Sequence, residues 1–524
     1  MILPPFEAFR AAVRGIEPPA YKDAASPAGS PAVLTILDDF SYACFAPEMN
    51  AVPVSRMDYR SAFDYYRPEF VLIESAWQGN KGNWRHQLVS PAGPKEAFID
   101  LLAEARRRDV PIAFWNKEDP PHFEQFLPVA KLADYVFTTA GELLDQYAEA
   151  VGHQNVAALP FAAQPSIHHP FSDQDRDENI CFAGQYFTHK FPERRAQMDF
   201  LFPAAARHGL TIYSRELGKD PRYAFPEPYA GMVKGSLPYN EIVRAYRRFK
   251  VFLNVNSVVD SPTMCARRIF ELSASGAVIL SARSRAIPNF YHDDELPLAD
   301  SEQDAALILD HLFEHPEELR AIAHRAWRRT LREHTYRHRV LNLRAAMGFS
   351  STESTRKLDV VIDARGARSV EPAQIEFSVR GWRSVLPAHN SVYLMTDDQP
   401  ESGPEAVETV TPSGLVSLSA ERDLIVATPT ARMTQAGLND AALAIDHYRS
   451  RGILGKSAYG DPLGASWRER TSARRSLWLA PQCVDLTGVL AQDMFSGGVQ
   501  ISHIDNYNLG DSALNADLST TAEV

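Results

Sequence analysis

Polar residues follow three apolar segments in the first quarter of the sequence, and each apolar segment has the length of a buried strand. The polar runs are Asp38-Asp39-Phe40-Ser41, Glu74-Ser75-Ala76-Trp77 and Asn116-Lys117-Glu118-Asp119-Pro120-Pro121-His122. A carboxylate or an imidazole at such a position can orient or deprotonate a substrate hydroxyl group. We therefore expect Asp39, Asp119 and His122 to be catalytic. Capping of the next helix explains Asp39 equally well, whereas a Lys-Glu-Asp run before two prolines has no evident packing role.

Two tryptophans near these runs, Trp77 and Trp84, offer flat apolar faces that suit the C–H faces of sugar rings. Burial in the core is the alternative for both residues.

A second set of candidates follows the apolar segment 179–183. Gly184 opens a run that ends at Lys190, and Arg194 comes at the start of the helix expected next. Glycine allows the backbone to approach a ligand closely, and a helix N-terminus with Lys or Arg neutralises a diphosphate. We expect this segment to bind phosphate groups, and a structural arginine on a helix face is the alternative for Arg194.

The string NVNSVVDSPTMCARRIFELSASG, which begins at Asn254, is the most informative part of the sequence. Asp260 and Ser261 predict a turn that offers free backbone N–H groups to a ligand. A carboxylate at Glu271, in the helix that follows, can accept two hydrogen bonds from the vicinal hydroxyls of a ribose. An ion pair with Arg267, four residues earlier, is the alternative partner for this carboxylate.

Strand-sized apolar segments alternate with helical patterns through the first 345 residues, which predicts βαβ units and parallel sheets. The expected strands lie at 32–37, 70–74, 112–115, 135–138 and 156–159, and then at 179–183, 211–213, 251–255 and 277–281. A helix over 263–275 is expected to end at Gly276 in a left-handed C-cap, and a last helix covers 317–343. We therefore expect two doubly wound domains, 1–165 and 166–347, with ligands at the carboxyl ends of the strands.

The polar stretch Gly348–Lys357 predicts a linker, as does the Pro- and Ala-rich stretch Pro18–Pro31. Strand-like segments at 358–362, 391–395 and 423–427 then predict a third α/β domain over 356–524, and the end of the chain after Gly510 is expected to be frayed.

Composition excludes several classes of function. The 524 residues carry a net charge of −12, which argues against a nucleic-acid partner. The four cysteines, Cys44, Cys181, Cys265 and Cys483, form no metal-ligand pattern, so we expect no metal site and no disulfides. Neither a signal peptide nor an apolar segment of membrane-spanning length is evident, so we expect a cytoplasmic protein.

The last predicted helix of the second domain carries six arginines between Arg325 and Arg339. A solvated basic face is the favoured interpretation, and a peripheral contact with anionic lipid is the alternative.

Several of these strings resemble the CgeB-type spore-maturation glycosyltransferases. They are FWNKEDPPHFEQFLPVAKLADYVFTTA at 114–140, LPFAAQPSIHHP at 159–170 and LNVNSVVDSPTMCARRIFELSASG at 253–276, together with LDDFSYACFAPE and LIESAWQGNKGNW. The resemblance covers roughly residues 32–343. It implies a GT-B fold of two facing Rossmann-like domains, in which the first domain binds the acceptor and the second binds a nucleotide-sugar donor.

The resemblance also implies roles for single residues. Glu271 resembles the ribose-binding glutamate of the E-x7-E pattern, and Lys190 and Arg194 resemble a diphosphate clamp. Thr263 stands eight residues before Glu271, where the pattern has its first glutamate, so the contact to the donor sugar is an open question. Such enzymes need no bound metal, and no cofactor is implied beyond the nucleotide-diphosphate sugar itself.

The third domain resembles a GT-A-like module through the stretch HYRSRGILGKSAYG at 447–460. No acids follow the strand at 423–427, where a working site of this type holds a divalent metal, and Asp397-Asp398 fits a turn. We expect a degenerate domain that serves acceptor binding or assembly.

The resulting hypothesis is a metal-independent glycosyltransferase that acts on a carbohydrate or protein acceptor in the synthesis of cell-surface glycans or glycoconjugates. A nucleotide-sugar epimerase and a non-catalytic nucleotide-binding scaffold are the alternatives.

Overall fold

The computed structural model describes residues 31–170, 176, 178–349, 358–364, 372–387, 390–395, 407–410, 423–427, 438–439, 442–443, 446–447, 453–455, 477–480 and 502–503. Several predictions fall outside these residues. They concern the stretch from Pro18, the linker after Phe349, Asp397-Asp398, most of 447–460, Cys483 and the end of the chain after Gly510.

The first domain is built on a parallel six-stranded sheet in the order β2-β1-β3-β4-β5-β6. Its strands are β1 (Ala32–Ile36), β2 (Asn50–Pro53), β3 (Phe70–Glu74), β4 (Ile112–Asn116), β5 (Tyr135–Thr138) and β6 (Val156–Ala158). Its helices are α2 (Asp39–Phe45), α3 (Tyr59–Tyr66), α4 (Glu96–Arg107), α5 (Phe123–Ala130) and α6 (Leu144–Val151). Every residue of β1, β3 and β4 is buried, because helices cover both faces of the sheet. The five predicted strands are confirmed, and β2 was not predicted.

A second parallel six-stranded sheet follows, in the order β12-β11-β10-β7-β8-β9. Its strands are β7 (Glu178–Ala183), β8 (Leu210–Tyr213), β9 (Val233–Gly235), β10 (Phe249–Asn254), β11 (Val278–Ala282) and β12 (Leu298–Ala299). Its helices are α7 (Pro192–Ala206), α8 (Tyr239–Ala245), α9 (Arg268–Ala274), α10 (Glu302–Glu314), α11 (Pro316–Glu333) and α12 (Tyr336–Ala346).

Two helix predictions in this domain need correction. The helix expected over 263–275 begins only at Arg268, because the preceding loop makes contacts with the first domain. Its end at Gly276 is confirmed, with φ at +73°. The helix expected over 317–343 is broken at His334, and Thr335 starts α12 with a capping box.

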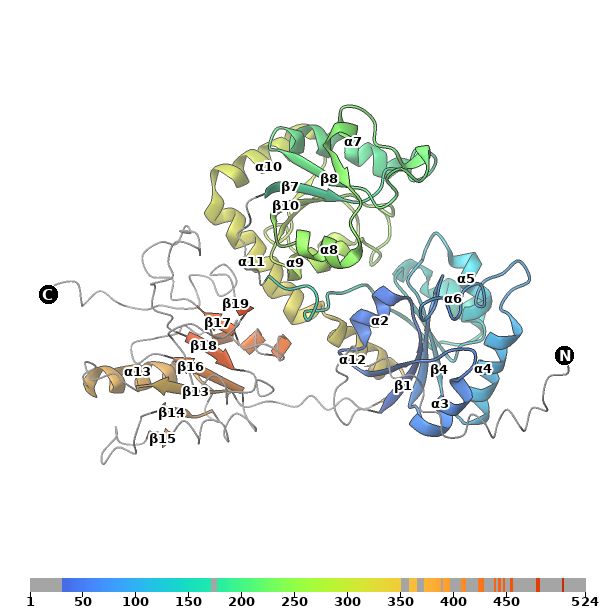
Figure 1. Ribbon diagram of the computed structural model, residues 1–524, viewed down its shortest axis with the longest axis horizontal. Coiled ribbons are helices and arrows are strands. Elements are labelled where there is room, and N and C mark those ends of the chain that lie inside the picture. Colours follow the sequence, from blue (N-terminus) through green and yellow to red (C-terminus); the bar gives the residue numbers. More distant parts are fainter. Residues whose placement is uncertain are drawn as a thin grey trace.

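Helix α12 returns to the first domain, where it packs against α2 (Figure 1). One apolar core runs through both domains, and the rings of Phe45 and Tyr336 meet in it at 4.8 Å between centroids. Arg344 of α12 forms a two-point ion pair with Glu69, at 2.5 and 3.0 Å. Loops at the carboxyl ends of β5 and β10 touch each other, so the two Rossmann-like domains face each other as in the GT-B fold.

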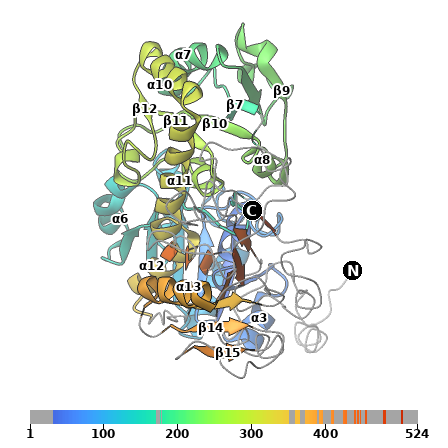
Figure 2. The ribbon, with the colours of Figure 1, turned by 90° about the vertical axis from the view of Figure 1, so that its left-hand side faces the viewer.

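The third α/β unit has a seven-stranded mixed sheet in the order β15-β14-β13-β16-β18-β17-β19. Its strands β14 and β15 lie at the bottom of Figure 2. Its elements are β13 (Leu358–Asp363), α13 (Pro372–Val385), β14 (Val392–Met395), β15 (Glu408–Val410), β16 (Asp423–Ala427), β17 (Ile453–Gly455), β18 (Leu477–Ala480) and β19 (Ser502–His503). Strand β18 is antiparallel to β16 and β17. Trp327 and Leu331 of α11 are buried in the core of this unit and join it to the second domain.

Candidate active site at the carboxyl ends of the two sheets

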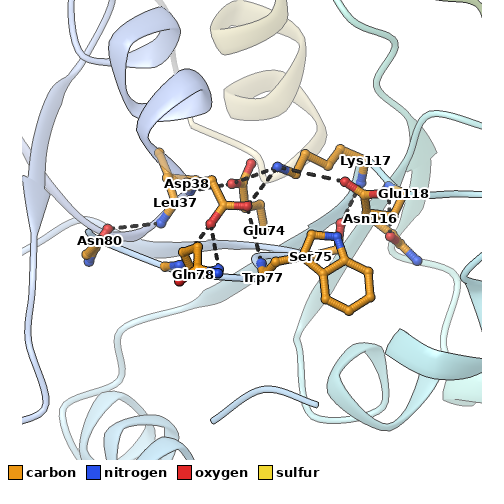
Figure 3. Close-up of polar contacts among 11 residues, drawn as sticks. Leu37, Asp38, Glu74, Ser75, Trp77, Gln78, Asn80, Asn116, Lys117 and Glu118 are labelled. Carbon is orange, nitrogen blue, oxygen red and sulfur yellow. Dashed lines mark hydrogen bonds and ion pairs between the residues drawn. The ribbon is translucent and has the colours of Figure 1, made fainter. Parts of the chain in front are cut away.

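A buried charge cluster occupies the carboxyl end of the first sheet, formed by Asp38 after β1, Glu74 at the end of β3 and Lys117 after β4 (Figure 3). Lys117 Nζ lies 3.0 Å from Asp38 Oδ2 and 3.2 Å from Glu74 Oε1. Burial raises the pKa of Glu74. Burial alone would lower the pKa of Lys117 and raise that of Asp38. The charges of Glu74 and then Asp38 instead raise the pKa of Lys117, and the charge of Lys117 lowers the pKa of Asp38. Lys117 and Asp38 are therefore charged at neutral pH.

Asp38 also fixes the loop that follows β3. Its carboxylate accepts hydrogen bonds from the backbone N–H groups of Trp77 at 3.2 Å, Gln78 at 3.0 Å and Gly79 at 2.8 Å (Figure 3). The amide of Asn80 donates to the carbonyls of Thr35 and Val54 and accepts from the N–H of Leu37. Four successive residues, 79–82, have left-handed φ angles between 49° and 88°. Left-handed backbone at non-glycine residues is unfavourable, so these contacts must hold the loop.

The fixed loop presents Trp77 at the surface, where 39% of the residue is exposed. Its ring makes edge contacts with His122, at 5.4 Å between centroids, and with Phe126, at 5.3 Å. Glu118 lies beside them, and its carboxylate has a weaker partner than Asp38 does, because Lys117 Nζ is 3.9 Å away. His122 Nδ1 contacts Gln125 at 2.9 Å. Trp84, by contrast, is a core residue with 1% exposure.

Asp119, one of the predicted catalytic residues, is completely buried. It accepts hydrogen bonds from Asn116 Nδ2 at 2.7 Å, Thr138 Oγ1 at 2.6 Å and Tyr147 OH at 2.9 Å. Burial raises its pKa to about 6 despite the hydrogen bonds from Thr138 and Tyr147. The run Lys117-Glu118-Asp119 was expected to have no packing role. This expectation is wrong, because the hydrogen bonds of Asp119 join β4 to β5 and α6. Asp39 is exposed in the first turn of α2, a position that favours an acidic residue.

In the second domain, Arg194 and Arg268 lie near the Phe182 ring at the end of β7, and Arg194 also lies beside Gly184. Arg194 is 6% exposed, and its guanidinium lies 5.9 Å from the ring centroid of Phe182, while that of Arg268 lies 5.8 Å from the same ring. Arg194 donates to the carbonyls of Gln185 and Val255 at 3.3 and 3.2 Å. A Cβ atom at residue 184 would lie 2.6 Å from the Phe182 ring and 3.1 Å from Arg194 Nη2, so only glycine fits.

These two cations have no acidic partner within ion-pair distance among the residues that the structure places, and the buried Arg268 Nη1 has no hydrogen-bond partner there. Burial and the charge of Arg268 lower the pKa of Arg194 to about 9. Burial likewise lowers the pKa of Arg268. The site therefore has an excess of buried positive charge, as an anion-binding site requires.

The other predicted donor-site residues lie in different surroundings. Lys190 is exposed, and its ammonium lies 4.8 Å from the ring centroid of Phe187. Asp260 is exposed as well, whereas Ser261 is buried. The hydroxyl of Ser261 accepts from the N–H groups of Thr263 at 3.4 Å and Met264 at 3.0 Å. The prediction of free N–H groups in this turn is therefore wrong for these two residues.

Glu271 is fully buried, and protein groups surround its carboxylate. It accepts from Tyr246 OH at 3.0 Å and Tyr239 OH at 3.3 Å, and Arg267 Nε lies 3.3 Å away. Burial alone would raise the pKa of Glu271, but Arg267 and then His168 lower it below the ordinary value. The ion pair with Arg267 is the alternative that the sequence left open. The Glu271 carboxylate is thus occupied by protein groups. This corrects the prediction that it is open to the hydroxyls of a ribose.

His168 completes this buried network. Its Nδ1 accepts from the backbone N–H of Gln164 at 3.0 Å, so the proton of the neutral ring is on Nε2. Nε2 then donates to Tyr239 OH at 2.7 Å, and Tyr239 donates to Glu271. Burial lowers the pKa of His168 to about 4.

Four of the six arginines between Arg325 and Arg339 are engaged within the protein. Arg325 pairs with Asp294 and Glu318, Arg329 with Glu295 and Glu333, and Arg337 with Asp446. Arg339 is 4% exposed and donates to the carbonyls of Pro160 and Phe161. These arginines are thus held by acids and carbonyls of the chain, which leaves the alternative of a lipid contact without support.

Comparison with known proteins relates this chain to glycosyltransferases. Residues 194–345 match the family model described as glycosyl transferase-like. The spore protein CgeB of Bacillus subtilis (strain 168) is 23% identical over 252 residues, which cover 45% of this chain and 75% of CgeB. The chain is therefore similar to CgeB and, over residues 194–345, to glycosyl transferase-like proteins. The matched region includes both buried arginines and Glu271.

Similar solved structures are glycosyltransferases with low sequence identity to this CgeB-like chain. The glycosyltransferase of Rickettsia africae is 8% identical and covers 61% of this chain and 90% of its own, with a TM-score of 0.40. HepE of Anabaena, in complex with UDP-glucose, is 12% identical and covers 56% and 81%, with a TM-score of 0.38.

Among the residues that the structure describes, no three His, Cys, Asp or Glu side chains are grouped to hold a metal. In the same residues, no helix combines the length and the apolar character needed to cross a membrane.

Four residues of this site received no role of their own from the sequence: Asp38, Glu74, Lys117 and Arg268. The first three stand in the strand-end runs and could have been found by asking which ionisable residues end adjacent strands. Arg268 lies three residues before Glu271 in the most informative segment.

Proposed function

We propose that this glycosyltransferase moves a sugar from a nucleoside-diphosphate sugar to a hydroxyl group of a carbohydrate or glycoconjugate acceptor, in the synthesis of cell-surface glycans. The observation that carries the proposal is the pair of arginines near the Phe182 ring, Arg194 and Arg268, neither of which forms an ion pair with an acid in the described part of the chain. An uncompensated buried charge costs several kcal/mol. A diphosphate would supply the missing negative charge and accept hydrogen bonds from both guanidinium groups.

The same arginines supply the chemistry of the leaving group. Negative charge develops on the nucleoside diphosphate as its bond to the sugar breaks, and fixed donors in a dry site stabilise it. Arg194 is held by two backbone carbonyls, and Arg268 begins α9. We propose on this basis a transfer that does not depend on a metal ion.

The acceptor, in this proposal, binds at the carboxyl end of the first sheet. Trp77 offers an exposed ring for the apolar face of a sugar. His122 contacts the edge of this ring, and the Glu118 carboxylate has Lys117 Nζ 3.9 Å away. We assign Glu118 or His122 as the group that takes the proton of the attacking hydroxyl, and Asp39 and Asp119 are less suited by position and burial.

Release of nucleoside diphosphate from a panel of UDP-, GDP-, TDP- and ADP-sugars, with mixed glycan acceptors, tests the proposal. We expect turnover with one nucleotide, reduced at least ~tenfold in Arg268→Met by loss of a contact to the leaving group. Arg207→Gln is the matched control, because Arg207 pairs with Glu302 on the surface of the same domain. A rearranged nucleotide sugar formed without acceptor would instead indicate an epimerase, and no turnover in the wild type would contradict the proposal.

A further inference from the structure

The loop after β10 in the second domain is hydrogen-bonded to the loop after β5 in the first domain. Thr263 Oγ1 donates to the carbonyl of Thr139 at 2.8 Å and accepts from the N–H of Gly141 at 2.6 Å. Ser261 Oγ donates to Glu142 Oε2 at 2.6 Å. We call these five residues the clasp. Its three hydrogen bonds join the carboxyl edges of the two sheets, where the donor and acceptor groups lie.

The second-domain half of the clasp is arranged in advance. Ser261 Oγ accepts from the N–H groups of Thr263 and Met264, so both lone pairs are used and its single proton is left for Glu142. Thr263 uses its hydroxyl as donor and acceptor at once. A Cβ atom on Gly141 would approach the Thr263 side chain to 3.1 Å, so a glycine at residue 141 keeps the two loops close.

The first-domain half of the clasp is fixed to the acceptor-side site. Thr138 Oγ1 accepts from the N–H of Ala140 at 3.0 Å and donates to the buried Asp119 at 2.6 Å. Asp119 is bound in turn to Asn116, the residue before Lys117 and Glu118. A displacement of the clasp would therefore be transmitted to the loop that carries Glu118 and His122.

We propose that the clasp sets the distance between the two domains at which transfer occurs, with Thr263 as its central positioning residue. The inference rests on the proposed function, in which donor and acceptor are held by different domains. Misplacement of reacting groups by about 1 Å can slow a reaction on the order of a hundredfold. Thr263 lies eight residues before Glu271, where the E-x7-E pattern has its first glutamate. In this chain Thr263 bridges the two domains instead.

Thr263→Val and Thr263→Ser form the matched pair of variants, because valine keeps the shape of threonine without the hydroxyl while serine keeps the hydroxyl. The interdomain distance is measured between spin labels on Glu96→Cys and Leu307→Cys, both at exposed positions of different domains, with Cys483→Ser as background. We expect Thr263→Val to shift or broaden the distance distribution and to lower kcat at least ~tenfold, with donor KM changed less than about twofold. Thr263→Ser should stay within about twofold of wild type in kcat and keep the wild-type distances.

A distance distribution and kcat of Thr263→Val equal to those of wild type would overturn the proposal. If Thr263→Val does not fold, Glu142→Ala replaces it, since the Glu142 side chain is exposed and its loss removes one bond of the clasp. The distance measurement needs no substrate. Failure of the wild type to use any nucleotide sugar would therefore refute the proposed function while the clasp is still tested.

Discussion

At the scale of the residue, the proposed anion site depends most on Arg268. Its guanidinium is buried, Nη1 is without a hydrogen-bond partner in the described residues, and Arg194 adds a second positive charge beside the same Phe182 ring. The sequence identified Gly184 and Arg194 from their place after a strand. It did not identify Arg268, because whether an arginine is paired depends on tertiary contacts that no spacing fixes. The partners of Glu271 could not be predicted for the same reason, because Tyr239 at the start of α8 and Tyr246 just after it donate hydrogen bonds to its carboxylate.

Removal of the Arg268 charge should have opposite effects on stability and binding. Arg268→Met is expected to keep or raise the melting temperature of the ligand-free protein, because a buried unpaired charge is replaced by an apolar chain of similar length, worth up to roughly 1–4 kcal/mol. Thermal melting followed by circular dichroism, without nucleotide, measures this. A loss of more than about 2 kcal/mol would show that Arg268 has a structural partner and would remove the anion-site argument.

His168 should make stability sensitive to pH. Its pKa is about 4 in the folded protein, below the ordinary 6.5, so between these values the unfolded chain binds a proton that the folded chain does not. The contribution of neutral His168 to the free energy of unfolding is complete above pH 6.5. It falls as the pH drops toward 4, by roughly 2 kcal/mol between pH 7 and pH 5. Urea unfolding of wild type and His168→Gln at both pH values should show a smaller loss in the variant, and equal losses would contradict the assignment.

At the scale of the element, strand-end loops position the charged and aromatic groups of the first domain. Alternating apolar and helical segments predicted the strands of both parallel sheets closely, because a strand covered on both faces is a continuous apolar run. Boundaries were missed where tertiary contacts override local pattern. The helix that begins at Arg268 is short because Ser261 and Thr263 bond to the first domain, and the break at His334 follows the capping of α12 by Thr335.

Lys117 is the cation that holds the charge cluster of the first sheet together. Lys117→Met leaves Asp38 and Glu74 buried without their cation, and we expect a loss of about 3–5 kcal/mol of stability. Lys131→Met, at an exposed position in the same domain, is the control and should change stability by less than about 0.5 kcal/mol. Chemical unfolding measures both. An unchanged Lys117→Met protein would mean that the cluster does not fix the loop that presents Trp77.

At the scale of the whole molecule, the chain combines two facing Rossmann-like domains with a third mixed sheet that packs on α11 through Trp327. The repeated βα pattern predicted the architecture, while the shared core, the return of α12 and the clasp depend on contacts between residues more than 100 positions apart. The GT-A-like character of the third unit stays a prediction. So does its role in acceptor binding or assembly.

The most direct test of the central claim, a nucleoside-diphosphate site around Arg194 and Arg268, is calorimetric titration of UDP, GDP, TDP, ADP and CMP into the purified protein, without metal and then with magnesium. The account predicts that one diphosphate binds without metal, at least ~tenfold more weakly to Arg268→Met and with unchanged affinity to Arg207→Gln. Equal affinity in the wild type and Arg268→Met, or no binding of any nucleotide to the wild type, would contradict it.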